Sequence, residues 1–150
     1  MKLSTKSRYA VMAICDLAER ANGKPVSLAD IAQRQDISLS YLEQLFARLR
    51  RAGLVKSVRG PGGGYLLGKT ASEIKIAAIV QAIDNETKRG GSGAGSTKAD
   101  KQPCQTHDLW EQLGKQMFWY LNRVTVEDVL VGTVPGATTA TDSKEQAAAD

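Results

Sequence analysis

The sequence predicts a mainly α-helical protein with one small β-hairpin. Apolar residues recur at helical spacing in several segments of the 150-residue chain. After the third segment, a turn rich in glycine and proline separates two short β-type runs. Helix, short turn, helix and hairpin is the order of a winged helix-turn-helix, and a long apolar helix near the C-terminus is predicted to serve dimerisation.

Two helices open the predicted fold. The first covers residues 5–21, with apolar side chains on one face, and Gly23 stops it. The second is capped by Ser27 and ends near Gln35. Asp36 then falls in the turn, where a left-handed backbone is usually required. Glycine adopts that conformation most readily, and aspartate tolerates it.

The third helix and the hairpin follow directly. Ser38 precedes the helix as its cap, and Gly53 ends it. One stripe of this helix is apolar and consists of Leu42, Leu45, Phe46 and Leu49. Residues 54–58 and 65–68 are expected to form the two strands, with the turn at residues 59–64.

Two more helices are predicted, one from Ser72 to Ile83 and a long one from about Thr106. The long helix carries both tryptophans, and its apolar arc is too wide for a single-faced surface helix, which favours pairing with a second copy of the chain. The expected organisation is a winged helix-turn-helix domain at residues 1–84, a glycine-rich flexible loop at 85–104, dimerisation helices at 105–131 and a disordered tail at 132–150.

The charge is unevenly distributed along the chain. The net charge of +4 divides into +7 for residues 1–75 and −3 for residues 76–150. A basic half points to a nucleic-acid partner, with a solvated basic face as the alternative. No apolar run approaches the roughly 20 residues of a membrane helix, and two cysteines cannot form a disulfide framework. We therefore expect a cytoplasmic protein with no membrane contact.

The polar face of the third helix is the candidate for reading double-stranded DNA. An α-helix fits the major groove, and its outward side chains can contact base edges. Gln44 can pair with adenine, and Glu43 can accept a hydrogen bond from cytosine. Ser38, Ser40 and the start of the helix can hold phosphates.

Basic and turn residues complete the predicted DNA-binding set. Arg48 and Arg51 are predicted to contact the DNA backbone, with plain solvated charge as the alternative. In the hairpin turn, Arg59, Gly60 and Pro61 form a thin tip that can enter a minor groove, and the arginine suits a narrow groove. The alternative for this turn is a simple tight connection without a ligand.

Residues 63–70 also satisfy the Walker A pattern of nucleotide-binding loops. The middle of the pattern is Tyr-Leu-Leu, which is typical of a strand and not of a flexible phosphate-binding loop. The sequence shows neither the several βα units nor the second acidic strand of a nucleoside triphosphatase. We therefore expect no enzyme activity.

Residues 28–69, together with Lys6–Ala10 and Thr106–Trp110, closely resemble the IscR-type iron–sulfur cluster regulators. The likeness covers roughly residues 1–131. It implies a homodimer that binds pseudo-palindromic promoter DNA and controls iron–sulfur assembly genes. The DNA-reading positions that it implies are Ser40, Glu43, Gln44 and Arg59, and all four are present.

The resemblance also implies a [2Fe–2S] cluster held by three cysteines and one histidine. Cys104 and His107 match this pattern, but Ser92 and Lys98 stand where the other two cysteines belong. Thiolates dominate iron–sulfur ligation, so we expect no stable cluster and no other cofactor in this chain. Asp36 departs from the pattern too, because it replaces the turn glycine.

The resulting prediction is a cytoplasmic, homodimeric, sequence-specific DNA-binding regulator that acts in a cluster-free form and contacts RNA polymerase. Two alternatives stay open. One is a thiol- or nitric-oxide-responsive regulator that uses Cys104. The other is a winged helix that binds proteins instead of DNA.

Overall fold

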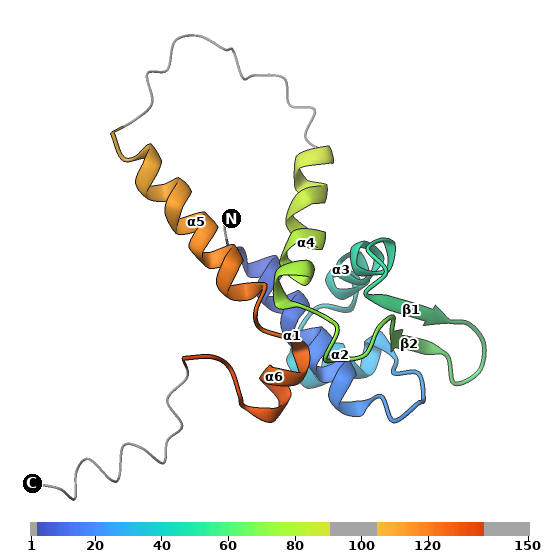
Figure 1. Ribbon diagram of the computed structural model, residues 1–150. Coiled ribbons are helices and arrows are strands. Elements are labelled where there is room, and N and C mark those ends of the chain that lie inside the picture. Colours follow the sequence, from blue (N-terminus) through green and yellow to red (C-terminus); the bar gives the residue numbers. More distant parts are fainter. Residues whose placement is uncertain (1–2, 91–104, 137–150) are drawn as a thin grey trace, which may run out of the picture.

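The computed structural model describes residues 3–90 and 105–136. In order, its elements are α1 (Thr5–Arg20), α2 (Leu28–Gln35), α3 (Leu39–Arg51), β1 (Val55–Val58), β2 (Gly64–Leu67), α4 (Ile76–Gly90), α5 (His107–Leu121) and α6 (Val126–Val131). The strands pair as one antiparallel hairpin. The predicted class, mainly α-helical with a hairpin wing, is confirmed (Figure 1). None of the described helices is both long and apolar enough to cross a lipid bilayer.

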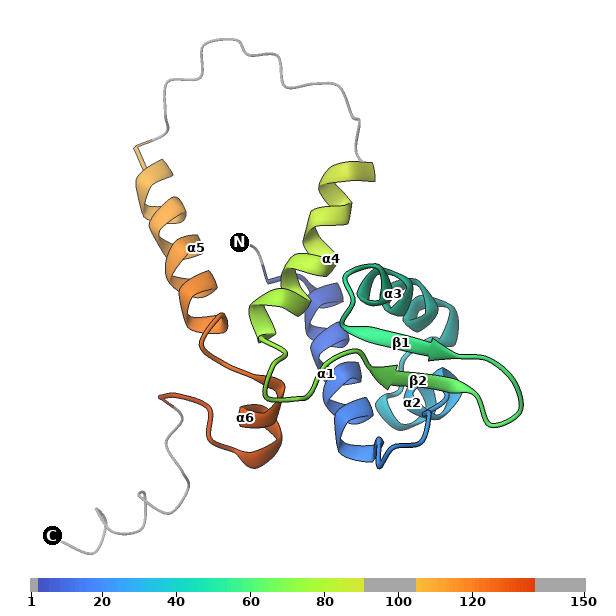
Figure 2. The same ribbon diagram turned by 45° about the vertical axis from the view of Figure 1, so that its right-hand side comes forward.

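The hydrophobic core lies where the apolar faces of α1, α3 and α4 meet. The central helix is α1, which contacts α2, α3, α4 and α6 (Figure 2). The predicted apolar stripe of α3 is buried in this core, which confirms the helical periodicity. Other fully buried side chains come from α1, α2, α4 and α6: Ile14, Leu17, Ile31, Ile79, Val80, Ile83 and Val126.

Local capping signals set the ends of α2 and α3. The Ser27 hydroxyl accepts from the amide of Asp30 at 3.2 Å, as the predicted N-cap. Asp36 has φ 53° and ψ 50°, so the left-handed turn predicted between the two helices is confirmed. At the end of α3, Gly53 has φ 76°, and the amides of Gly53 and Leu54 bond to the carbonyls of Arg50 and Leu49. This pair of bonds is a Schellman motif, which only a left-handed residue such as glycine closes cheaply.

Both ends of α4 differ from the predicted bounds. The prediction that this helix begins at Ser72 is wrong: residues 71–73 form a turn and the helix begins at Ile76. The start is fixed from a distance, because Lys75 pairs with Thr125 and the amide of Ile76 donates to Val124 at 2.9 Å. The helix continues to Gly90, so the first six residues of the predicted 85–104 loop are helical.

The C-terminal segment also differs in part from the expectation. Val124 and Val126 are buried in the same core as α1, so the first turn of α6 belongs to this core and not to a partner surface. Residues 132–136 of the predicted tail make defined contacts: the Tyr120 hydroxyl donates to the Pro135 carbonyl at 2.9 Å, and Thr133 donates to Asp128. The rest of the predicted tail lies outside the described residues.

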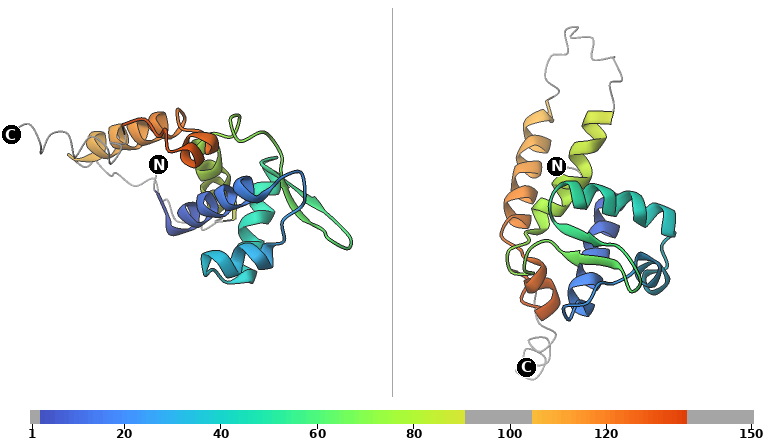
Figure 3. Two further views of the ribbon diagram at one scale, coloured as in Figure 1. Left: turned by 90° about the horizontal axis from the view of Figure 1, so that it is seen from below. Right: turned by 90° about the vertical axis from the view of Figure 1, so that its right-hand side faces the viewer.

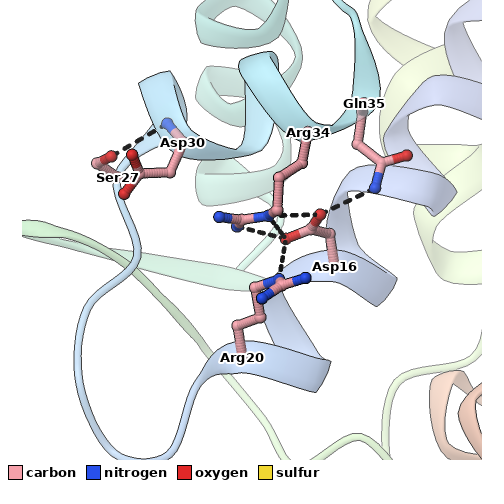
Figure 4. Close-up of polar contacts among 6 residues, drawn as sticks. All are labelled: Asp16, Arg20, Ser27, Asp30, Arg34 and Gln35. Atoms are coloured by element: carbon pink, nitrogen blue, oxygen red, sulfur yellow. Dashed lines mark hydrogen bonds and ion pairs between the residues drawn. The ribbon is translucent and has the colours of Figure 1, made fainter.

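A buried carboxylate joins α1 to α2. The Asp16 side chain is only 4% exposed. It accepts hydrogen bonds from Arg34, the shortest at 2.7 Å, and from the Gln35 amide at 2.8 Å, while Arg20 lies at 3.7 Å (Figure 4). Burial alone would raise the pKa of Asp16, but these hydrogen bonds and charges outweigh it and lower the pKa below its ordinary value of 3.8.

We expect Asp16→Ala to lower the free energy of unfolding by about 2 kcal/mol, because Arg34 and Gln35 lose their shared acceptor. The stabilisation is present above the ordinary pKa of 3.8 and is lost as the pH falls towards the lower folded-state value, since the unfolded chain then binds the proton more readily. Urea unfolding followed by circular dichroism between pH 7 and pH 3 measures both effects. Glu19→Gln, an exposed change on the same helix, is the control. Equal curves for wild type and Asp16→Ala would contradict this account.

Candidate nucleic-acid interface

The face of α3 opposite the core is polar and open to solvent. Ser40, Glu43 and Gln44 are all exposed, and Ala47 is half-buried beside them. These positions follow from the apolar stripe, because a helix that buries one stripe must turn the opposite positions outward. Of the predicted base-reading residues, none is packed inside the protein. The surface carries one carboxylate, one amide and one hydroxyl, a set that can discriminate base edges by donor and acceptor pattern.

Two exposed serines, Ser38 and Ser40, lie at the N-terminus of α3. Ser38 occupies the N-cap position, but its side chain makes no capping bond to the helix amides. Its hydroxyl lies instead 3.1 Å from that of Ser40. The first amides of a helix lack intrahelical partners and carry partial positive charge, which suits an anion such as a phosphate. Both serines are therefore accessible to a phosphate, as their predicted role requires.

The arginines near the C-terminal end of α3 point in different directions. Arg48 is half-buried, and its guanidinium donates to the backbone carbonyl of Ile83 in α4 at 3.2 Å. Arg50 is exposed, with Nη1 3.5 Å from the Ser57 hydroxyl on β1. Arg51 is exposed as well. The sequence analysis grouped Arg48 with the DNA contacts. It could not identify the Ile83 carbonyl as a partner, because this acceptor lies 35 residues away along the chain.

The hairpin forms a narrow wing whose tip is exposed. Val58 and Gly64 are the last cross-strand pair, and Arg59, Gly60 and Pro61 at the turn are all exposed. Gly60 has φ 107°, a conformation that side chains rarely adopt. The tip projects on the side of the molecule away from α5 (Figure 3). The middle of the Walker A pattern at residues 63–70 lies on β2, so this part is a strand and not a phosphate loop, as the sequence analysis predicted.

A residue that sequence analysis missed ties the wing to α3. Tyr65 on β2 packs edge-on against Phe46 at 5.0 Å between ring centroids, and its backbone pairs with that of Val26 just before α2. Gly64 is required beside it, because a Cβ there would collide with the backbone of Val26. The only available signal was the position of an aromatic residue on a predicted strand, which does not identify its partner.

The residues of the predicted cluster site are only partly described. Ser92, Lys98 and Cys104 lie outside the described residues. His107 is exposed at the first position of α5, with Nε2 3.7 Å from a carboxylate oxygen of Glu111. Donor atoms of His107, Asp108 and Glu111 lie within 4.8 Å of one another, but Glu111 also pairs with Lys115 at 3.2 Å. Such pairs are ordinary contacts on a helix surface.

The described cysteine, Cys15, is half-buried beside the core. Burial and, to a lesser degree, the nearby Glu19 raise its pKa to about 11. Its thiol therefore stays protonated at neutral pH and is a poor nucleophile. Its position and its protonated thiol are typical of a small residue packed against the core.

The second notable surface is α5, which contains no buried residue at all. Trp110 is 62% exposed and Trp119 is 58% exposed. Their large apolar neighbours on α5 and α6 are exposed too: Leu109, Leu113, Tyr120, Val129, Leu130 and Val131. An exposed apolar surface of this kind is typical of an interaction site.

Comparisons with known proteins agree with this geometry. The sequence profile of the Rrf2 family, described as iron-dependent transcriptional regulators, matches residues 3–132. This chain belongs to the Rrf2 family. The HTH-type transcriptional regulators IscR of Serratia proteamaculans and Escherichia coli are each 50% identical to it, covering 87% of this chain and 79% and 80% of the relatives.

Solved structures of Rrf2 regulators show the same fold. IscR of T. potens matches with a TM-score of 0.70 at 39% identity, covering 95% of this chain and 96% of that structure. CymR, the global cysteine regulator of B. subtilis, matches with a TM-score of 0.68 at 35% identity, covering 87% and 97%. The resemblance to IscR-type regulators and the winged-helix class are thereby confirmed. This Rrf2 protein is a DNA-binding transcriptional regulator, in a family of transcriptional regulators and not of enzymes.

Proposed function

We propose that this Rrf2 protein is a cytoplasmic homodimer that reads pseudo-palindromic promoter DNA. Ser40, Glu43 and Gln44 would contact base edges in the major groove, and the wing tip at Arg59 would enter the adjacent minor groove. The observation that carries the proposal is the exposure of this polar face of α3 together with the exposed wing tip. The proposed targets are iron–sulfur assembly genes, and promoter binding would bring the protein into contact with RNA polymerase.

Glu43 is the proposed specificity residue. A carboxylate facing DNA repels phosphates, so it favours binding only where a base offers a donor such as the amino group of cytosine. Glu43 is exposed and has no described ion pair that would compensate its charge. It therefore penalises sequences that lack the donor.

The dimer is proposed to form through α5. Among the described residues, α5 leaves two tryptophans and several aliphatic side chains exposed, and α4 is its main contact. Two copies of α5 packed together would remove this apolar surface from water, at roughly 25 cal/mol per Å² buried. Twofold symmetry would then present the two α3 helices to two half-sites.

The donor set does not fit a [2Fe–2S] cluster. Such a cluster takes four protein ligands, and thiolates dominate among them. Of the four positions in the pattern, only Cys104 and His107 are cluster ligands, because serine is a poor ligand at neutral pH and the lysine must first lose its proton. We propose that the protein binds DNA without a cluster.

A thiol-based signal is the second candidate for control. The chain has two cysteines, and the raised pKa of Cys15 leaves Cys104 as the candidate for thiolate chemistry at neutral pH. Loss of the oxidant response of DNA binding in Cys104→Ala would support this mode. An unchanged response, or no response in the wild type, would dismiss it.

We expect Glu43→Ala to broaden the set of bound sequences and not merely to weaken binding. Selection from a pool of random duplexes, followed by sequencing, compares the sites of wild type and variant. Glu73→Ala, which removes an exposed acid away from α3, should leave the set unchanged. If wild type selects no consensus, sequence-specific reading is wrong; if Glu43→Ala selects the wild-type set, the role of Glu43 is wrong.

We expect Leu113→Glu to dissociate the dimer, because it places a charge in the proposed α5 contact. Light scattering after size exclusion should give twice 16.1 kDa for wild type and a single 16.1 kDa chain for the variant. Gln112→Glu, also exposed on α5, is the matched control and should stay dimeric. A monomeric wild type, or a dimeric Leu113→Glu variant, would rule out this interface.

We expect the protein to be colourless after anaerobic purification and to contain no stoichiometric iron. Visible absorption and an iron assay test this. The variant that combines Ser92→Cys with Lys98→Cys restores three cysteines at six-residue spacing and should gain both colour and iron. Brown wild-type protein would show that the present donors suffice and would overturn the cluster-free form.

A further inference from the structure

Arg48 joins α3 to α4. Its half-buried guanidinium donates to the Ile83 carbonyl at 3.2 Å. A carbonyl oxygen has two lone pairs, so one inside a helix can accept a side-chain donor in addition to its helical amide. Of the arginines on α3, Arg50 and Arg51 are exposed, whereas Arg48 is half-buried and donates to α4.

The same point on α4 is also bound to α1. Asp84, the residue after Ile83, accepts from the Ser7 hydroxyl at 3.1 Å, and Ser7 is fully buried. Two consecutive residues of α4 are thus held by two different helices. Together with the Asp16 contacts between α1 and α2, polar bonds connect α2 to α1, α1 to α4 and α4 to α3.

This arrangement constrains the angle of α3. Hydrophobic packing is non-directional and permits small rotations of a helix on its core. A guanidinium bonded to a carbonyl across the junction narrows the range of arrangements, because the bond requires a defined distance and angle and is partly shielded from water. A rotated α3 would displace Ser40, Glu43 and Gln44 together.

We propose that Arg48 is a positioning residue, which sets the orientation of α3 on α4 and thereby supports sequence discrimination, and that it is not a phosphate contact. The inference rests on the proposed reading of DNA by α3. It reassigns Arg48 from the set of backbone contacts expected from the sequence. The two roles differ in charge dependence, because only a phosphate contact releases counterions on binding.

Salt dependence distinguishes these roles. Affinity is measured at several KCl concentrations on two probes: a duplex selected by the wild type from a random pool, and a mixed-sequence duplex. We expect Arg48→Ala to reduce the preference for the selected duplex roughly fivefold, with an unchanged slope of log affinity against log salt. Arg59→Ala, the control for a phosphate or groove contact, should make this negative slope shallower by about 0.9. If Arg48→Ala fails to fold, Arg48→Gln removes the same charge while keeping a polar side chain.

Three outcomes overturn the proposal. A slope that becomes shallower by about 0.9 with Arg48→Ala would make Arg48 a phosphate contact. An unchanged preference between the two probes, even with reduced thermal stability, would leave Arg48 only a structural role. An unmoved carbonyl ¹³C resonance of Ile83 in Arg48→Ala would show that the bond is absent in solution, whatever happens on DNA.

The carbonyl resonance also separates this inference from the proposed function. If that resonance moves in Arg48→Ala but not in Arg59→Ala, the contact exists. If the wild type then shows no preference for any duplex, DNA reading by α3 fails, and the positioning role fails with it. A moved resonance together with a reduced preference and an unchanged salt slope supports the proposal.

Discussion

Burial of the apolar stripe of α3 is the constraint on which both candidate DNA-contacting surfaces depend. Leu42, Leu45, Phe46 and Leu49 are buried in the core, and each contributes about 1.5–3 kcal/mol on burial. That burial determines which residues of α3 face outward. The wing depends on it too, because Tyr65 packs against Phe46. The polar face of α3 and the wing therefore both depend on this helix. The polar face lies opposite the buried stripe, and the wing packs against Phe46 of the stripe.

Polar contacts fix the helix orientations that apolar packing alone leaves variable. A single hydrogen bond contributes about 1 kcal/mol net, less than one of the buried leucines, so these bonds do not hold the fold together by themselves. Their role is directional. Asp16 fixes α2 against α1, and the Ser7–Asp84 contact fixes α4 against α1. A few buried or half-buried polar groups thus orient α2 and α4 against α1 around an apolar centre.

The features predicted from the sequence are those decided by neighbouring residues. The stripe of α3, the cap at Ser27, the left-handed Asp36 and the role of Gly53 all depend on spacing within one or two turns. The features missed depend on distant partners. Ser72 resembles a helix cap, yet pairing between Lys75 and Thr125 decides where α4 begins. For the same reason the sequence could not show that Arg48 faces α4, that Tyr65 joins the wing to α3, or that Val126 enters the core.

The chemistry of α3 favours discrimination over affinity. A surface built for strong, unselective binding would present several free cations to the phosphates. Here the proposed reading face carries a carboxylate, an amide and a hydroxyl. The exposed Arg50 and Arg51 lie at the C-terminal end of α3, and the half-buried Arg48 donates to α4. In the proposed complex, Glu43 would repel phosphates at every sequence, so favourable binding would require a base donor that compensates this cost. In the proposed function, a chain that lacks two of the four cluster ligands but keeps this face would select a promoter sequence without a bound cluster.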